Sequence, residues 1–127
     1  MKLILENWRE YINDPAEEVI EALIEMGGEE EGVIVKGPSP LKAISISTQM
    51  NTIWIHWIEG DGTGGAWEFL RGVISQVSPN TPIALEANYV AAPFWIKQGF
   101  DEISISEAEE IYPTVEPDNR FFWREKV

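Results

Sequence analysis

Residues 52–66 read TIWIHWIEGDGTGGA. The first part, residues 52–58, is almost entirely apolar and rich in β-branched and aromatic side chains, which is typical of a central strand covered on both faces. Four glycines follow within residues 60–65. An apolar stripe at helical spacing begins directly afterwards and ends before Pro79; it consists of Ala66, Phe69, Leu70, Val73, Ile74 and Val77. The stretch therefore predicts a buried strand, a glycine loop and a helix in direct succession.

The glycine loop predicts a site for an anion. Each ordered glycine costs roughly 0.5–1 kcal/mol relative to alanine, so four of them need a physical reason. Glycines allow positive φ and close approach of a ligand, and a loop before a helix directs free N–H groups and the positive end of the helix dipole at one point. The loop lacks the Lys and Ser/Thr of a mononucleotide P-loop, which disfavours ATP or GTP hydrolysis. A plain tight turn remains the alternative.

Two helices are predicted upstream of this stretch. The first has apolar residues at helical spacing, namely Ile4, Trp8, Tyr11 and Ile12. The second begins after Asp14, an N-cap residue that is followed by Pro15 and, three residues after the cap, by Glu17 as in a capping box. It ends at Gly27-Gly28, and its apolar stripe is Ala16, Val19, Ile20, Leu23 and Ile24.

The remaining elements are predicted to be strands, with one further helix. Residues 32–36 and 42–48 precede the central strand and are separated by a turn, which favours an antiparallel meander. After the helix come a strand at 81–87, a helix from Asn88 to Gly99, and two short strands at 102–106 and 119–124. The order ααβββαβαββ in 127 residues predicts one α/β (α+β) domain spanning residues 1–127.

The composition excludes several classes of function. The chain has 9 Lys+Arg against 22 Asp+Glu, a formal net charge of −13, so we expect no nucleic-acid partner. With no cysteine and a single histidine, we also expect no metal site. No apolar run is long enough to span a membrane and the first residues lack a signal-peptide pattern, so we expect a cytoplasmic protein without a membrane partner. The acidity indicates either solvated surfaces or a docking surface for a basic partner.

Two motifs resemble signatures of the GCN5-related N-acetyltransferase (GNAT) family. Residues 59–66 resemble its pyrophosphate-binding loop, Gln/Arg-x-x-Gly-x-Gly/Ala, with Gly62 and Gly64 at the two small positions. Residues 88–100 resemble its second signature, Asn-x-x-Ala-x-x-aromatic/apolar-Tyr-x-Lys-x-Gly-Phe, at Asn88, Ala91, Phe94, Lys97, Gly99 and Phe100. The chain has Glu59 where the first motif has Gln or Arg, and Trp95 where the second has Tyr.

The resemblance implies a mixed, mainly antiparallel twisted sheet with a splayed parallel strand pair and flanking helices. It implies that acetyl-coenzyme A is the co-substrate and lies between the strands at 52–58 and 81–87. The pantetheine arm would pair near Trp57 and Ile58, and the thioester would lie between Asn88 and Trp95. The pyrophosphate would take backbone N–H groups from Asp61, Gly62, Thr63, Gly64 and Gly65.

The implied activity is transfer of an acetyl group to a primary amine of a small molecule or a protein, and the acidic surface favours a cationic acceptor. His56 is a candidate general base, and Glu59 is a candidate to orient a water that accepts the amine proton. Glu86, which ends the next strand near the splayed pair, is a further catalytic candidate. Tyr89 is a candidate acid for the leaving thiolate, because the indole of Trp95 cannot supply a proton. Whether the protein forms a homodimer stays open.

Two other interpretations compete with an enzyme. A GNAT-fold protein without activity would use its acidic surface to bind a basic partner, and a purely structural α/β domain would use the glycine loop as a turn. If Gly64 has a negative φ, Gly64→Ala should weaken coenzyme A binding and leave stability nearly unchanged. Six aromatic residues are expected in the core, with room for two of them to line a cleft: Trp54, Trp57, Phe94, Trp95, Phe121 and Trp123.

Overall fold

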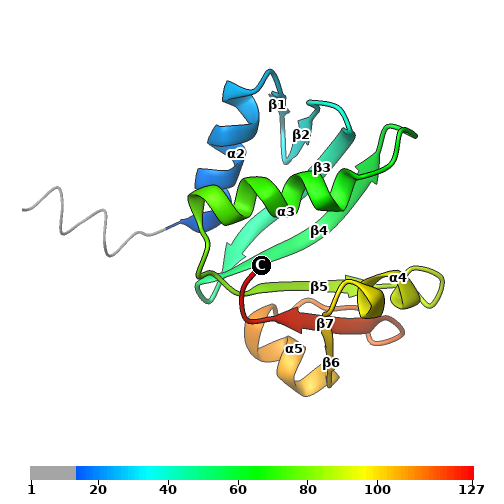
Figure 1. The fold of residues 1–127 in the computed structure, drawn as a ribbon. Coiled ribbons are helices and arrows are strands. Elements are labelled where there is room, and N and C mark those ends of the chain that lie inside the picture. Colours follow the sequence, from blue (N-terminus) through cyan, green and yellow to red (C-terminus); the bar gives the residue numbers. More distant parts are fainter. Residues whose placement is uncertain (1–13) are drawn as a thin grey trace, which may run out of the picture.

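The computed structural model describes residues 14–127, which form a seven-stranded sheet and four helices. The strands lie in the order β1-β2-β3-β4-β5-β7-β6 (Figure 1). Their bounds are β1 Glu29–Glu31, β2 Ile34–Lys36, β3 Leu41–Gln49, β4 Thr52–Gly60, β5 Ile83–Ala87, β6 Asp101–Ile103 and β7 Arg120–Arg124. Neighbouring strands are antiparallel except β4 and β5, which are parallel. The expected fold class, with its one parallel pair, is confirmed.

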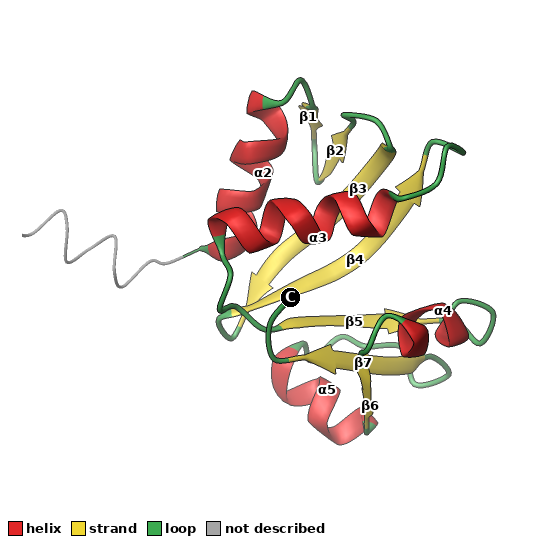
Figure 2. Cartoon of the chain, viewed as in Figure 1, coloured by secondary structure: helices red, strands yellow, loops and turns green. Residues whose placement is uncertain are grey.

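The helices cover both faces of this sheet (Figure 2). Helices α2 (Pro15–Glu25) and α3 (Ala66–Val77) lie over one face, α5 (Ile105–Ile111) lies against the other, and α4 (Ala92–Lys97) follows the end of β5. Alternate residues of β4 enter different cores: Ile53 and Ile55 belong to the larger core with α2 and α3, whereas Trp54 belongs to a smaller core with Ala108 of α5. The central strand is therefore covered on both faces, as its composition predicts.

The predicted start of α2 is confirmed. Asp14 caps the helix by accepting a hydrogen bond from the Glu17 N–H at 3.1 Å, and Pro15 occupies the first turn. The strands expected at 42–48, 52–58 and 81–87 and the helix that begins at Ala66 are also found. The helix expected around Trp8 lies outside the described residues.

The strand expected at residues 102–106 is wrong. Only Asp101–Ile103 is extended, and α5 begins right after it. The cause is a capping box, in which the Ser104 hydroxyl accepts from the Glu107 N–H at 3.2 Å and the Glu107 carboxylate accepts from the Ser104 N–H at 3.0 Å. These reciprocal bonds satisfy helix N–H groups and offset the weak helical pattern of a seven-residue segment.

A second departure lies before β3. The strand expected at residues 32–36 is shorter, Ile34–Lys36, and it forms a hairpin with the additional strand β1. All three residues of β1 are exposed glutamates, which in the sequence indicate only a charged surface. Their charge suits an edge strand, because it discourages pairing with another sheet.

The six aromatic residues divide between core and cavities. Trp54, Trp95 and Phe121 are buried, and Trp123 is partly buried. Trp57 and Phe94 are 44% and 46% exposed, so these two are not core residues, in keeping with the room left for two of the six to line a cleft. Trp57 lines a cavity between the parallel strands, and Phe94 lines a cavity at the start of α3.

Candidate functional site

The parallel strands β4 and β5 part from each other halfway along their length. Their pairing covers only Ile53–Ile55 against Ile83–Leu85, although β4 continues to Gly60 alongside β3. In Figure 1 the two strands lie together at one end and diverge toward α4 and the loop before α3. A cavity of about 260 Å³ lies where they diverge, lined by Ile55, His56, Trp57, Ile58, Leu85, Glu86, Ala87, Asn88, Ala91 and Trp95.

A β-bulge at His56 accounts for the separation. Ser45 pairs with Trp57 while Ile46 pairs with Ile55, so His56 is an extra residue in β4 with no opposite residue in β3. A bulge bends the strand that carries it and increases its twist. Because β4 follows β3 beyond this point, its backbone groups that face β5 no longer meet a paired strand.

Six of the residues singled out in the sequence line this cavity. They come from β4, from β5 and from the segment that follows β5: His56, Trp57, Ile58, Glu86, Asn88 and Trp95. The side chain of Asn88 also has a local role, because its Oδ1 accepts a hydrogen bond from the Ala91 N–H at 2.8 Å. The strand pair therefore gathers residues that lie more than thirty positions apart in the chain.

His56 is held from the neighbouring strand and packs against an aromatic ring. Its Nε2 lies 2.7 Å from the Ser47 hydroxyl oxygen, and its ring meets Tyr112 edge to face with centroids 5.1 Å apart. Part of the imidazole is exposed, but the burial of the remainder lowers its pKa below the ordinary value of 6.5, and the negative charge of Glu86 opposes that shift. The lowered pKa favours the neutral imidazole, the state that a general base requires.

Glu86 is half-buried and fixed by donors from the loop before β7. Its Oε2 accepts hydrogen bonds from the Glu116 N–H at 3.2 Å and from the Asn119 side-chain amide at 3.1 Å. These bonds hold the carboxylate as an acceptor at the wall of the cavity. The resulting charge lies near His56, where it favours the protonated imidazole.

Two other candidates lie outside the cavity lining. Glu59 forms an ion pair with Lys42 of β3, Oε1 to Nζ 3.2 Å, on the side of β4 away from β5. Tyr89 is 71% exposed, with the Arg120 guanidinium 6.0 Å from its ring centroid. The structure therefore does not bring either residue together with His56 and Glu86.

The glycine loop has positive backbone φ angles, which glycine adopts more easily than other residues. Gly62, Gly64 and Gly65 have φ of +94°, +83° and +80°, and a Cβ at any of them would meet no atom within 4 Å. Positive φ at Gly64 means that an alanine there is strained, so the expectation of unchanged stability for Gly64→Ala is wrong. The open space above all three glycines is what a bound group in contact with the backbone requires.

Asp61 organises the first half of this loop. Its carboxylate accepts hydrogen bonds from the Ser39 hydroxyl and from the hydroxyl and N–H of Thr63, and these bonds lower the pKa of Asp61 below its ordinary value. The Asp61 N–H donates to the Pro40 carbonyl at 2.9 Å. Since the N–H groups of Asp61 and Thr63 are engaged, those of Gly62, Gly64 and Gly65 are the ones left for a ligand. Helix α3 begins at Ala66, and its N-cap residue Gly65 provides no side-chain hydrogen bond, which leaves the N–H groups of the first turn similarly open.

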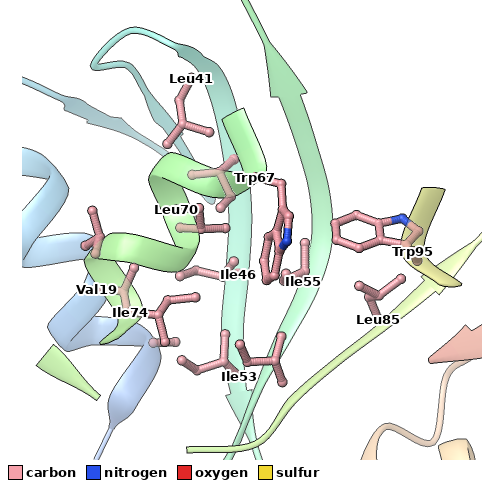
Figure 3. Close-up of a cluster of buried hydrophobic side chains, with 14 of the residues drawn as sticks. Val19, Leu41, Ile46, Ile53, Ile55, Trp67, Leu70, Ile74, Leu85 and Trp95 are labelled. Carbon is pink, nitrogen blue, oxygen red and sulfur yellow. The ribbon is translucent and has the colours of Figure 1, made fainter. Parts of the chain in front are cut away.

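A second cavity of about 330 Å³ adjoins the start of α3, lined by Gly64, Gly65, Ala66, Trp67, Glu68, Phe94 and Gln98. Figure 3 shows Trp67 and Trp95 reaching toward each other from α3 and α4, with Ile55 and Leu85 close by. The two indoles meet edge to face at 5.3 Å, and both pack on Phe100. These contacts fix the wall between the glycine loop and the opening of the strands.

Ser47 and Tyr112 are the neighbours of His56 that sequence reasoning missed. Ser47 is visible in the sequence only as a polar position of an alternating strand, and Tyr112 as a residue in an acidic segment. Their contact with His56 depends on the β3–β4 register and on the packing of the end of α5. Among residues 14–127, acidic and histidine side chains do not gather into a group that could hold a metal ion. The same part of the chain contains no helix long and apolar enough to cross a membrane.

Comparison with solved structures identifies the class of fold. The chain is similar to the crystal structure of an acetyltransferase of the GNAT family from Staphylococcus aureus Mu50, with a TM-score of 0.50 and 15% sequence identity. The match covers 85% of this chain and 74% of that chain. No family model matches the chain, and no curated protein does. At 15% identity the likeness shows the fold alone, and that fold is GNAT-like.

Proposed function

We propose that this protein is an N-acetyltransferase that moves an acetyl group from acetyl-coenzyme A to a primary amine. The observation that carries the proposal is the opening between β4 and β5, which has free strand backbone on one side and the uncapped glycine loop at its end. Coenzyme A needs these two features together, because its extended pantetheine arm requires a channel and its doubly charged pyrophosphate requires N–H donors.

The glycine loop suits the pyrophosphate of coenzyme A. The N–H groups of Gly62, Gly64 and Gly65 would hold the pyrophosphate, because their φ angles and the open space above them permit direct contact. Of the two carboxylates that would repel a phosphate, that of Glu59 is paired with the Lys42 ammonium, and that of Asp61 is held in place by hydroxyl groups, which keep it ionised. When bound, acetyl-coenzyme A supplies an activated acyl group as a thioester.

His56 is the base in the proposed reaction. The amine nitrogen forms a bond to the acetyl carbonyl carbon, the carbon–sulfur bond breaks, and its electron pair leaves with the thiol sulfur. His56 accepts the proton that the amine loses, and the imidazolium returns it to the thiolate, so that the products are an amide and free coenzyme A. Since Trp95 has no proton to give and Tyr89 lies outside the cavity lining, His56 both accepts the proton of the amine and donates it to the thiolate.

The acceptor in this proposal carries positive charge. Glu86 lines the cavity, and α5, which lies next to His56 through Tyr112, exposes Glu107, Glu109 and Glu110. Residues 101–118 hold seven acids and no base. Such a surface attracts polyamines, aminoglycoside-like compounds or lysine-rich segments and repels anionic amines.

The test combines binding and turnover. Coenzyme A at millimolar concentration should raise the unfolding temperature, because a ligand of the folded state stabilises it by mass action. With acetyl-coenzyme A and a panel of cationic, neutral and anionic amines, free thiol should appear fastest with the cationic ones, and more slowly as salt screens the attraction. His56→Gln should lower kcat by roughly a hundredfold, the usual contribution of a general base. Absence of stabilisation by coenzyme A would count against the whole proposal.

A second candidate function is a binding module without activity. This alternative is favoured by Trp95, which stands where the second GNAT signature has a tyrosine that could donate a proton. The Trp95 indole packs against Trp67, Phe94 and Phe100. In that case coenzyme A would still bind, no amine would release thiol, and a basic protein would bind to the acidic surface. Turnover with any amine of the panel excludes this alternative.

A further inference from the structure

A line of hydrogen bonds reaches His56, the single histidine of the chain, from the adjacent strand. Ser47 Oγ lies 2.7 Å from His56 Nε2, and the Gln49 side-chain nitrogen lies 2.9 Å from the same Oγ. Ser47 and Gln49 are two residues apart on β3 and so lie on one face of the sheet. Within residues 14–127, His56 Nδ1 has no hydrogen-bond partner, so it is the ring nitrogen left for a substrate.

We propose that Ser47 is a positioning residue: its hydroxyl accepts a hydrogen bond from His56 Nε2–H and so keeps Nδ1 unprotonated for the acceptor amine. The inference rests on the proposed function, in which His56 is the base. A neutral imidazole carries its proton on one nitrogen, and the hydrogen bond made by one nitrogen decides which. With the proton on Nε2, the lone pair on Nδ1 can take the proton that the amine loses.

The acceptor capacity of the Ser47 oxygen supports this assignment. A hydroxyl oxygen has two lone pairs; the Gln49 amide donates to one, and the other is available to Nε2–H. The bulge makes the contact possible, because it places His56 opposite no residue of β3 and lets its ring reach across to Ser47. The titratable groups that face His56 are Glu86 from β5 and Tyr112 at the end of α5; Ser47 and Gln49 carry no charge.

Nuclear magnetic resonance of the single histidine tests the proposal without any need for activity. Nitrogen-15 shifts of the intact protein at neutral pH should show the Nε2–H form as the main tautomer. Ser47→Ala should weaken that preference and lower the pKa of His56, since the lost bond stabilises the imidazolium more than the neutral ring. Ser47→Thr keeps the hydroxyl and should restore both. Ser45→Ala, on the same strand and face without a hydrogen bond to His56, is the matched control and should change neither.

The kinetic readout follows the same variants. In Ser47→Ala, kcat should fall about tenfold, the acid limb of the kcat/KM profile should move to lower pH, and KM for acetyl-coenzyme A should stay the same. A main Nδ1–H tautomer in the unsubstituted protein, or a rise in the pKa of His56 in Ser47→Ala, overturns the proposal, because both mean that Ser47 donates to Nε2. If no amine is acetylated but the tautomer and the pKa of His56 behave as stated, the proposed function is wrong, whereas the hydrogen bond by which Ser47 sets the tautomer of His56 is supported.

Discussion

Gly64→Ala is the substitution that best separates a ligand-binding loop from a plain turn. Gly64 has φ +83° and its Cβ would meet no atom within 4 Å. A non-glycine residue in this left-handed region costs about 1–2 kcal/mol, and the reduced freedom of the unfolded chain offsets about 0.4–1 kcal/mol of this. We therefore expect the free energy of unfolding to fall by about 1 kcal/mol.

Gly32→Ala is its matched control. Gly32 lies in the turn between β1 and β2, with φ +63° and equally open space around a Cβ. The same backbone argument predicts the same loss of stability, since neither alanine meets a neighbour. Gly32 is remote from the opening between β4 and β5, so its substitution should leave coenzyme A affinity unchanged.

Affinity is where the two variants should differ. At Gly64 the added methyl group occupies the space over an N–H that would face the pyrophosphate, and loss of a hydrogen bond to a charged group costs roughly 1.5–3 kcal/mol. The dissociation constant for coenzyme A should therefore rise by about ten- to a hundredfold. Urea denaturation and calorimetric titration of both variants measure the two quantities. Equal stability losses together with equal, unchanged affinities would refute the binding loop and leave a turn.

Three further predictions concern other parts of the molecule. Glu86→Gln removes the negative charge that raises the pKa of His56, so the acid limb of the kcat/KM profile should move to lower pH. Trp54→Phe removes a buried indole N–H that has no partner within residues 14–127, so the free energy of unfolding should change by less than about 1.5 kcal/mol despite full burial, as denaturant titration would show. The hydrogen bond from Ser39 is the main cause of the lowered pKa of Asp61. Asp61 therefore stabilises the fold fully above its ordinary pKa of 3.8 and loses this effect as pH falls through the lower folded value; the urea midpoints of Asp61→Asn and the unsubstituted protein should converge in acid.

Local patterns were sufficient for most elements and for the place of the glycine loop. The alternation in β3, the continuous apolar run of β4 and the stripe of α3 each follow from side-chain period, which is a property of neighbouring residues. The capping box at Ser104 and Glu107 is equally local, so α5 was within reach of the sequence. The alternation of Ile103 and Ile105 instead favours a strand at residues 102–106.

Function at the site depended on contacts that no local pattern contains. The sequence by itself determined a strand, a flexible-backbone loop and a helix in succession, and it named His56, Glu86, Asn88 and Trp95 as candidates. Only the tertiary structure decided that these four line one cavity while Glu59 turns to Lys42. The physical reason is the register between strands. A one-residue bulge in β4 sets where β5 stops pairing and which side chain of β3 contacts the histidine. This register is selected by the pairing of strands that are distant in the sequence, not by interactions between neighbouring residues.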